Sequence, residues 1–529
     1  MITPLTPIDF KRRASKLYPK KTAIIDGDSS WTYEEFDRRT WRLSHGLQSL
    51  GLTFGDHIAV MLPNTHEMIE CFYGIGQMGA VMVPLNVRLA EEEVLYILDH
   101  SDAKAIIVDS EFGSMIERLI PRLTQIHTFI QVESGFSSTL NARDYETLLE
   151  SASGSPFVVD LDENQAITIN YTSGTTSKPK GVILTHRNNY INAADFLYHL
   201  RVVHEDVYLH TLPLFHANGW GGVWALTAVG ATHICMRKVD PVQTLKLMVD
   251  QQVTLACGAP TVLNMLINAP GADQVTITTH PRMATAGSPP PAAVIDKVQK
   301  MFHMDIIHVY GLTEVSPFIT YCEWRAEFNS LPQEEQAKIK ARQGVELVFN
   351  GETKVVRKDA SEVEWNGREI GEIVTRGNVV MEGYYKQPDQ TAKAIRDGWF
   401  YTGDLAVVYS DGYIEIVDRS KDVIISGGEN VSSVEVEGVL YEHPSILEVG
   451  VIAIPDEQWG EVPKAYIVLK DGMTLDETEL REWCRSRMGH FKVPKIFAFV
   501  DMLPRTATGK LQKYRLREQD WRGSDKFVN

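Results

Sequence analysis

The sequence has few cysteines, and none of them has the spacing of a metal site. Its 529 residues include five cysteines, and no two of them form a CxxC motif. They are Cys71, Cys235, Cys257, Cys322 and Cys484. A sparse, odd set in a long chain is typical of reduced, buried thiols. We therefore expect no zinc finger, and we expect a reducing, cytoplasmic location.

The sequence also lacks long apolar runs and an excess of positive charge. No run approaches the roughly 18 apolar residues of a membrane-spanning helix, so we expect no transmembrane segment. The net charge is −17, and this sign disfavours a nucleic-acid partner because phosphate binding needs a positive field. With 44% hydrophobic residues, the chain can bury large cores. At about 150 residues per domain, its length predicts three to four structural units.

Apolar segments of strand length alternate with segments of helical period through the first 310 residues. Strands are predicted at 57–62, 81–85, 103–109, 166–169, 253–256 and 306–309, and helices at 33–50, 67–78 and near 91–99. Such alternation predicts an α/β fold with mostly parallel sheets flanked by helices. Because the pattern recurs from 207 to 310, we expect two such sheets in one large N-terminal domain.

The pattern changes twice in the C-terminal half. From about 345 to 413, short strands and glycine turns predict a small antiparallel sheet or β-barrel. After 418–422 the composition changes again, to a predicted α+β segment with helices at 434–441 and 477–488 and strands at 449–455 and 464–469. This last segment has the size of a separate small domain. We therefore place a large domain at 1–420 and a small C-terminal domain at 421–529.

The most specific segment is a polar loop, Tyr171–Gly181, with the sequence YTSGTTSKPKG. Its small hydroxylated residues and glycines leave backbone N–H groups able to face phosphate oxygens, and Lys178 and Lys180 add positive charge. It is not a Walker A loop, because Lys180 precedes Gly181 and a strand-like run follows, whereas that motif needs Gly-Lys-Ser/Thr at the start of a helix. A polar surface hairpin is the alternative interpretation.

Three later segments favour nucleotide chemistry over a plain hairpin. Val309–Glu314 (VYGLTE) places an aromatic ring, a tight turn, a hydroxyl and a carboxylate at a strand end. Tyr401–Asp404 (YTGD) has a carboxylate suited to accept hydrogen bonds from ribose hydroxyls, and Pro504–Lys510 (PRTATGK) has a lysine on a loop. Each could be an ordinary turn, but together and in this order they form a specific pattern.

These motifs resemble those of the adenylate-forming superfamily of acyl-CoA synthetases, luciferases and peptide-synthetase adenylation domains. The resemblance covers essentially the whole chain and includes DRSKD at 418–422. The segments PLFHANGWGGVW, CGAPTVLNM and TAGSPPP are similar to the branch with fatty-acyl-CoA and benzoyl-CoA ligases. The resemblance implies a mobile C-terminal domain and two half-reactions. A carboxylic acid and ATP give an acyl-adenylate and pyrophosphate, and CoA then displaces AMP to give a thioester.

Carried over residue by residue, the resemblance implies a nucleotide site. The β- and γ-phosphates would contact Thr172, Ser173, Gly174, Thr175, Thr176 and Lys180. Gly287, Ser288 and Pro289 would line the adenine, Tyr310 would stack on it, and Asp404 and Arg419 would bind the ribose. Mg²⁺ would be held by Thr172 and Glu314, and the implied catalytic residues are Lys510, Thr313, Glu314 and His216.

The resemblance also implies a moving lysine and a hinge. Lys510 would bridge the carboxylate and the α-phosphate. These two anions repel each other, so a positive charge is needed where negative charge develops at the α-phosphorus. Lys421 stands at the family's hinge position, with a solvated surface lysine as the alternative. Rotation there would remove Lys510 and bring Gly427, Gly428 and Glu429 towards the CoA tunnel.

The expected acyl site lies between residues 213 and 226. His216 would gate the passage, and Trp220, Gly221, Gly222 and Val223 would line the acyl pocket; the alternatives for His216 and Trp220 are ordinary core side chains. The segment has no carboxylate to pair a substrate ammonium, so we expect a neutral acyl or aryl tail. The glycines are expected to leave space for it. We favour medium- to long-chain fatty acids, with short branched-chain or aromatic acids as the alternative.

Other functions share part of this pattern. A P-loop kinase has a different lysine spacing, and a luciferase-like oxygenase shares every adenylation motif. A nucleotide-binding regulator without catalysis should have lost Glu314, Lys510 or Asp404, and all three are present. We therefore expect an AMP-forming acid–thiol ligase that uses ATP, Mg²⁺ and CoA on a small carboxylic acid. The sequence leaves open whether it forms a homodimer.

Overall fold

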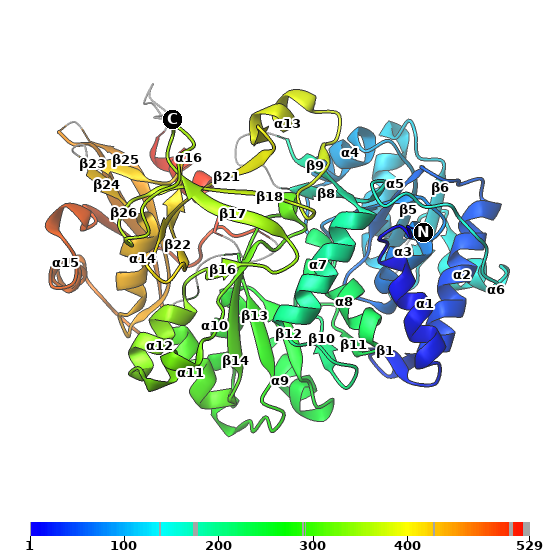
Figure 1. Cartoon of the computed structure of the whole chain (residues 1–529), viewed down its shortest axis with the longest axis horizontal. Coiled ribbons are helices and arrows are strands. Elements are labelled where there is room, and N and C mark those ends of the chain that lie inside the picture. The colour runs from blue at the N-terminus through cyan, green and yellow to red at the C-terminus, as the bar shows by residue number, and fades with distance from the viewer. Residues whose placement is uncertain are drawn as a thin grey trace.

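The computed structural model describes residues 2–136, 139–172, 178–287, 290, 292–426, 429–456, 458–506 and 511–521. The two large sheets and their helices fill the right and lower parts of Figure 1, and the C-terminal segment, in orange and red, lies at the left. Through the described ranges, no helix combines the length and the apolar character that a membrane crossing requires.

The first large sheet has eight strands, and most of them come from the N-terminal third of the chain. Its central pairings are parallel, whereas β8 with β9 and β9 with β19 are antiparallel. In spatial order the strands are β19 (Gly383–Tyr384), β9 (Lys180–Thr185), β8 (Ala166–Thr172), β4 (Val81–Pro84), β3 (His57–Met61), β5 (Ala103–Asp109), β6 (Thr128–Val132) and β7 (Arg143–Asp144). The strands predicted at 57–62, 81–85, 103–109 and 166–169 are confirmed.

The second large sheet has nine strands with a parallel centre and antiparallel strands at both edges. In spatial order they are β16 (Val345–Glu346), β15 (Thr320–Tyr321), β14 (Asp305–Tyr310), β13 (Arg282–Thr285), β12 (Leu255–Gly258), β10 (Val207–Leu209), β11 (Thr232–Cys235), β1 (Thr22–Asp26) and β2 (Ser29–Thr32). The strand predicted at 253–256 begins two residues later than expected, at Leu255, where pairing with β10 and β13 starts.

The two sheets share one core, and each has a second core on its outer face. In β5, Ala105 and Ile107 enter the shared core, whereas Ile106 and Val108 enter the outer one. This division follows from the two-residue period of a strand. Burial on both faces explains why the strand consists of a continuous apolar run.

Helices form the layers between and outside the sheets. The shared core includes side chains from α1 (Ile8–Leu17), α2 (Tyr33–Ser49), α3 (His66–Gly76), α6 (Tyr145–Glu150), α7 (His186–His199) and α8 (Gly222–Val229). The outer cores include α4 (Glu91–His100) and α5 (Ser110–Leu119) on the first sheet, and α9 (Pro241–Asp250), α10 (Pro260–Ile267) and α11 (Ala292–Phe302) on the second. Local chemistry sets their ends: α2 begins at a capping box in which Thr32 and Glu35 bond each other's backbone N–H.

The segment predicted as a small antiparallel sheet or barrel is a five-stranded antiparallel sheet. Its strands are β17 (Gly351–Val356), β18 (Gly371–Gly377), β20 (Ile395–Arg396), β21 (Trp399–Val408) and β22 (Ile414–Arg419). Helix α12 (Gln333–Lys340) precedes this sheet along the chain, and α13 (Pro388–Ala394) lies between β19 and β20.

The C-terminal segment forms its own sheet and core, as the composition predicted. Antiparallel strands β24 (Glu429–Val431), β23 (Ile424–Ser426), β26 (Gly460–Leu469) and β25 (Ile446–Asp456) are joined by β27 (Ile496–Phe499), which is parallel to β26. The helices are α14 (Ser433–Tyr441), α15 (Glu477–Arg485) and α16 (Lys513–Asp520). Short 3₁₀ turns complete the chain: η1 (Ile120–Arg122), η2 (Ala217–Gly221), η3 (Ala272–Gln274), η4 (Thr313–Val315), η5 (Ala326–Ser330) and η6 (His490–Lys492).

Candidate active site

The carboxyl ends of neighbouring parallel strands bring several motif residues to one edge. Strands β13 and β14 pair in parallel; Gly287 follows the first, Tyr310 ends the second, and Thr313 and Glu314 form the following turn η4. Gly311 must be glycine, because a Cβ there would lie 1.6 Å from the carbonyl oxygen of Pro317. Such an edge is where open α/β sheets bind ligands.

Tyr310, Asp404 and Arg419 form one connected group. The Tyr310 hydroxyl donates to Asp404 Oδ2 (2.7 Å), and Arg419 Nε lies 3.2 Å from Asp404 Oδ1. Asp404 and Arg419 are direct cross-strand partners in β21 and β22. Burial, together with the Asp404 charge, raises the pKa of Tyr310 well above its usual value, so the phenol stays protonated as the donor. The group joins the parallel-sheet edge to the antiparallel sheet.

The polar loop connects the two antiparallel strands β8 and β9. Thr172 and Lys180 are cross-strand partners at its base, and both are half-buried. Lys180 Nζ donates to Gln390 Oε1 (3.2 Å) and lies 4.7 Å from the centroid of the Tyr384 ring. The hydroxyl of the same tyrosine donates to Glu314 Oε1 (2.9 Å). Tyr384 therefore links the base of the polar loop to the η4 turn.

Thr172 and Glu314 have ligand atoms that suit Mg²⁺. The donor set is a hydroxyl and a carboxylate, and oxygen ligands are those that this hard cation prefers. Glu314 is half-buried at the turn, and its carbonyl accepts a hydrogen bond from Met381 N–H (2.8 Å), which fixes its backbone. The chemistry of both residues fits a magnesium site that is completed by substrate phosphates.

The predicted acyl segment contains a left-handed turn. All five residues of Ala217–Gly221 have positive φ, from 44° to 81°. This conformation costs about 1–2 kcal/mol for each residue other than glycine, so the surroundings must hold it. Asn218 is buried; its Nδ2 donates to Thr168 Oγ1 and Asn189 Oδ1 (both 2.9 Å), and its Oδ1 accepts from Asn170 Nδ2 (2.9 Å). Strained backbone held in this way is concentrated at functional sites.

Side chains of other elements approach Gly221 and Gly222. A Cβ at Gly221 would lie 2.0 Å from Asn192 Nδ2, whereas one at Gly222 would lie 3.4 Å from the Tyr208 hydroxyl, an ordinary contact distance. Gly221 therefore allows close packing, and the acyl-pocket role of both glycines stays a prediction. Trp220, 5% exposed, contacts Phe318 edge-on with ring centroids 5.5 Å apart.

His216 and Val223 flank this turn. His216 is half-buried and immediately precedes η2, where its carbonyl accepts from Gly219 N–H (3.0 Å). Val223 is fully buried in the first turn of α8, and its carbonyl accepts from the Tyr73 hydroxyl (3.2 Å). Both residues lie within four positions of Trp220 along the chain, and their roles as gate and pocket lining stay predictions.

Lys421 lies in the turn that joins the antiparallel sheet to the C-terminal segment. Its carbonyl accepts a hydrogen bond from Arg517 Nη1 of α16 (2.8 Å), and Arg517 Nη2 pairs with the Asp422 carboxylate. The Lys421 side chain is exposed, but burial of its ammonium and the neighbouring charge of Arg419 lower its pKa to about 8. Glu429, the described member of the predicted CoA-tunnel set, is exposed on β24.

Several predicted site residues lie outside the described residues. They are Ser173, Gly174, Thr175 and Thr176 of the loop, Ser288 and Pro289 of the adenine wall, Gly427 and Gly428 of the CoA tunnel, and Lys510. The contacts that sequence reasoning missed are those of Tyr384, Gln390, Phe318 and Asn192. No local signal marks these side chains, because each meets a partner from a distant segment.

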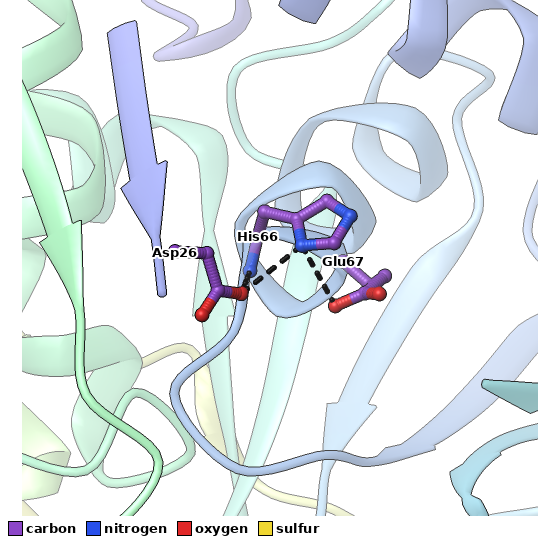
Figure 2. A group of neighbouring side chains, drawn as sticks. All are labelled: Asp26, His66 and Glu67. Atoms are coloured by element: carbon purple, nitrogen blue, oxygen red, sulfur yellow. Dashed lines mark hydrogen bonds and ion pairs between the residues drawn. The ribbon is translucent and has the colours of Figure 1, made fainter. Parts of the chain in front are cut away.

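A separate polar cluster joins β1 to the start of α3 (Figure 2). Asp26 Oδ2 accepts from the His66 backbone N–H (2.9 Å) and lies 3.0 Å from His66 Nδ1, which is also 3.2 Å from Glu67 Oε2. These three residues could supply metal ligands. However, the hydrogen bonds account for the arrangement, since Asp26 caps α3 where Thr65 makes no side-chain cap. We therefore assign the cluster a structural role.

We expect Asp26→Ala to lower the free energy of unfolding by about 1–2 kcal/mol, because α3 loses its N-terminal acceptor. Burial opposes the charge of His66, but the hydrogen bond that its ring donates to the Asp26 carboxylate raises its pKa. The loss should therefore be largest below the unfolded histidine pKa of about 6.5 and should shrink as pH rises through the raised value. Urea denaturation at several pH values measures it. The exposed Asp28→Ala is the control, and equal midpoints for both variants would contradict the cap.

Known proteins resemble this chain over most of its length. The family model of AMP-binding enzymes matches residues 10–385, and that of the AMP-binding enzyme C-terminal domain matches residues 435–510. The chain is 42% identical to a 2-methylpropanoate–CoA ligase of Humulus lupulus (98% of this chain, 95% of that one). It is 41% identical to 4-hydroxybutyrate–CoA ligase 2 of Metallosphaera sedula (97% and 94%).

A solved structure extends the agreement to three dimensions. The anthranilate CoA ligase AuaEII, in complex with anthranoyl-AMP, superposes with a TM-score of 0.90 at 25% identity, covering 98% of both chains. Family model, relatives and fold therefore agree over nearly the whole sequence. The chain belongs to the AMP-binding enzyme family, as an acid–thiol ligase of the AMP-forming acyl-CoA synthetase class.

Proposed function

We propose that this enzyme joins a short branched or aromatic monocarboxylic acid to CoA through an acyl-adenylate. The observation that carries the nucleotide part is the hydrogen-bonded group of Tyr310, Asp404 and Arg419 beside the η4 turn. In this proposal the large domain, residues 1–420, binds ATP and acid, and the small domain, residues 421–529, supplies Lys510. Glu314 and Thr172 hold Mg²⁺, which offsets the negative charge of the triphosphate when bound.

Each protein group has a task in the first half-reaction. Asp404, kept close to Arg419, accepts hydrogen bonds from the ribose, and Tyr310 offers its ring to the adenine. Lys180 and the loop bind the leaving pyrophosphate. Lys510 places one positive charge between the carboxylate and the α-phosphate, where the two anions approach. Its later departure opens the path by which the CoA thiol, passing His216, attacks the acyl carbon.

The names of the relatives support a small acid. The turn at 217–221 is closely packed, with Trp220 against Phe318 and Asn192 close to Gly221. Named relatives act on 2-methylpropanoate, butyrate and benzoate. The sequence-based preference for medium- to long-chain acids stays a prediction with less support. The cytoplasmic location also stays a prediction, because some relatives are named peroxisomal.

A panel of acids tests the substrate. We expect pyrophosphate release without CoA to show the highest kcat/KM for 2-methylpropanoate, butyrate or benzoate, with losses of about 10–200-fold for each poorly accommodated methylene group. Decanoate and palmitate complete the panel. A maximum at ten carbons or more would contradict the proposal, and no release with any acid would contradict adenylation itself.

A further inference from the structure

Tyr384 contacts two predicted site residues that come from different sheets. Its hydroxyl donates to Glu314 Oε1 (2.9 Å), and Lys180 Nζ lies 4.7 Å from the centroid of its ring. Glu314 belongs to η4, next to the second large sheet, whereas Lys180 begins β9 of the first. One side chain therefore touches both the residue assigned to the metal and the residue assigned to the phosphates.

The backbone of Tyr384 is anchored independently of Glu314. Tyr384 pairs with Val182 in the ladder of β19 and β9, and its N–H donates to Thr391 Oγ1 of α13 (2.9 Å). Figure 1 shows α13, in yellow, above the β8–β9 edge of the first sheet. Because the strand and the helix fix the tyrosine from both sides, the tyrosine can orient the carboxylate of Glu314.

The chemistry of the contact suits an orienting role. A phenolic hydroxyl is a hydrogen-bond donor at neutral pH, and here it donates to Glu314 Oε1 over 2.9 Å. A donor on one carboxylate oxygen restricts rotation of the whole group. Loss of such a partner behind a metal ligand typically costs about 10–100-fold in metal affinity or activity. The ring face also attracts the Lys180 ammonium by a cation–π interaction.

We propose that Tyr384 is a positioning residue that aims Glu314 at Mg²⁺ and keeps Lys180 beside the triphosphate. The proposal rests on the proposed function, which assigns Glu314 to the metal and Lys180 to the phosphates. Tyr384 acts through these two side chains and touches no reacting atom.

Tyr384→Phe tests the proposal, because it removes the hydroxyl and keeps the ring. We expect Mg²⁺-dependent ATP binding, measured by titration calorimetry, to weaken about 10–100-fold, and the Mg²⁺ concentration for half-maximal pyrophosphate release to rise. Thioester formation from supplied acyl-AMP should not change. The adjacent Tyr385→Phe is the matched control, since the Tyr385 hydroxyl donates to Asp102 Oδ2 (2.7 Å) instead. This control variant should bind ATP with the same Mg²⁺ dependence as the wild type.

A double-mutant cycle shows whether Tyr384 acts through Glu314. If it does, Tyr384→Phe should weaken Mg²⁺-dependent ATP binding in the wild type and have little further effect in Glu314→Ala. The positioning role would be overturned if Tyr384→Phe lowered the ATP affinity equally in both backgrounds, or if it did not lower the affinity in the wild type. If Glu314→Ala itself leaves the Mg²⁺ dependence unchanged, the metal assignment of the proposed function fails instead.

Discussion

Replacing Lys510 with alanine is expected to slow acyl-adenylate formation by about 10²–10³-fold, the usual cost of losing one charge-stabilising contact. A carboxylate that attacks a triphosphate meets electrostatic repulsion, and a compact ammonium on a long stem can neutralise charge as it develops. In the second half-reaction a thiol attacks the uncharged acyl carbon of the acyl-adenylate and AMP leaves, so this step does not need the lysine. Pyrophosphate release should therefore fall while thioester formation from supplied acyl-AMP stays close to wild type.

The control for this variant is an exposed lysine of the same C-terminal segment, Lys495. Lys495→Ala should leave both half-reactions unchanged, so a general effect of lost charge is separated from the loss of Lys510. Equal slowing of both half-reactions in Lys510→Ala would contradict a role confined to adenylation. Such a result would point to damage of the C-terminal segment as a whole.

The sequence could place residues that lie at the ends of neighbouring parallel strands. Tyr310 follows the apolar run predicted as a strand at 306–309, which places it at a strand end. Gly287 is assigned to the same site through the family resemblance, and the parallel pairing of β13 with β14 accounts for its position. Asp404 and Arg419 could be expected to cooperate through the family resemblance. Their direct pairing across β21 and β22 depends on the register of these strands, which shifts at an irregularity between Leu405 and Ala406 that no local sequence pattern predicts.

Contacts between distant segments could not be predicted in this way. Tyr384 contacts Glu314 because β19 pairs with β9, although the two strands are about 200 residues apart in the sequence. The glycines at 221 and 222 are recognisable as small residues, but their nearest neighbours, Asn192 and Tyr208, come from α7 and β10. A glycine in the sequence is compatible with an open pocket or with the close approach of a neighbouring side chain, and the tertiary packing determines which of the two occurs.

Replacing Lys421 with proline is expected to spare adenylation and impair thioester formation. Proline fixes φ near −65°, whereas a hinge residue must change its backbone angles between the two orientations of the small domain. The hydrogen bonds of this turn use the N–H groups of Ser420, Asp422 and Val423, and the carbonyl that accepts from Arg517 is retained in proline. A bias of about 1.4 kcal/mol against the second orientation would lower the thioester rate about tenfold.

Lys421→Ala is the matched control, because it removes the ammonium and keeps the backbone free to rotate. If the turn acts as a hinge, alanine should retain thioester formation and proline should lose it, with pyrophosphate release similar in both. Equal loss in the two variants would assign the effect to the side chain of Lys421, whose pKa is lowered to about 8 by burial and by the neighbouring charge of Arg419. An unchanged thioester rate in the proline variant would place the hinge elsewhere along the connection, since a locked φ at the pivot cannot leave the rotation unaffected.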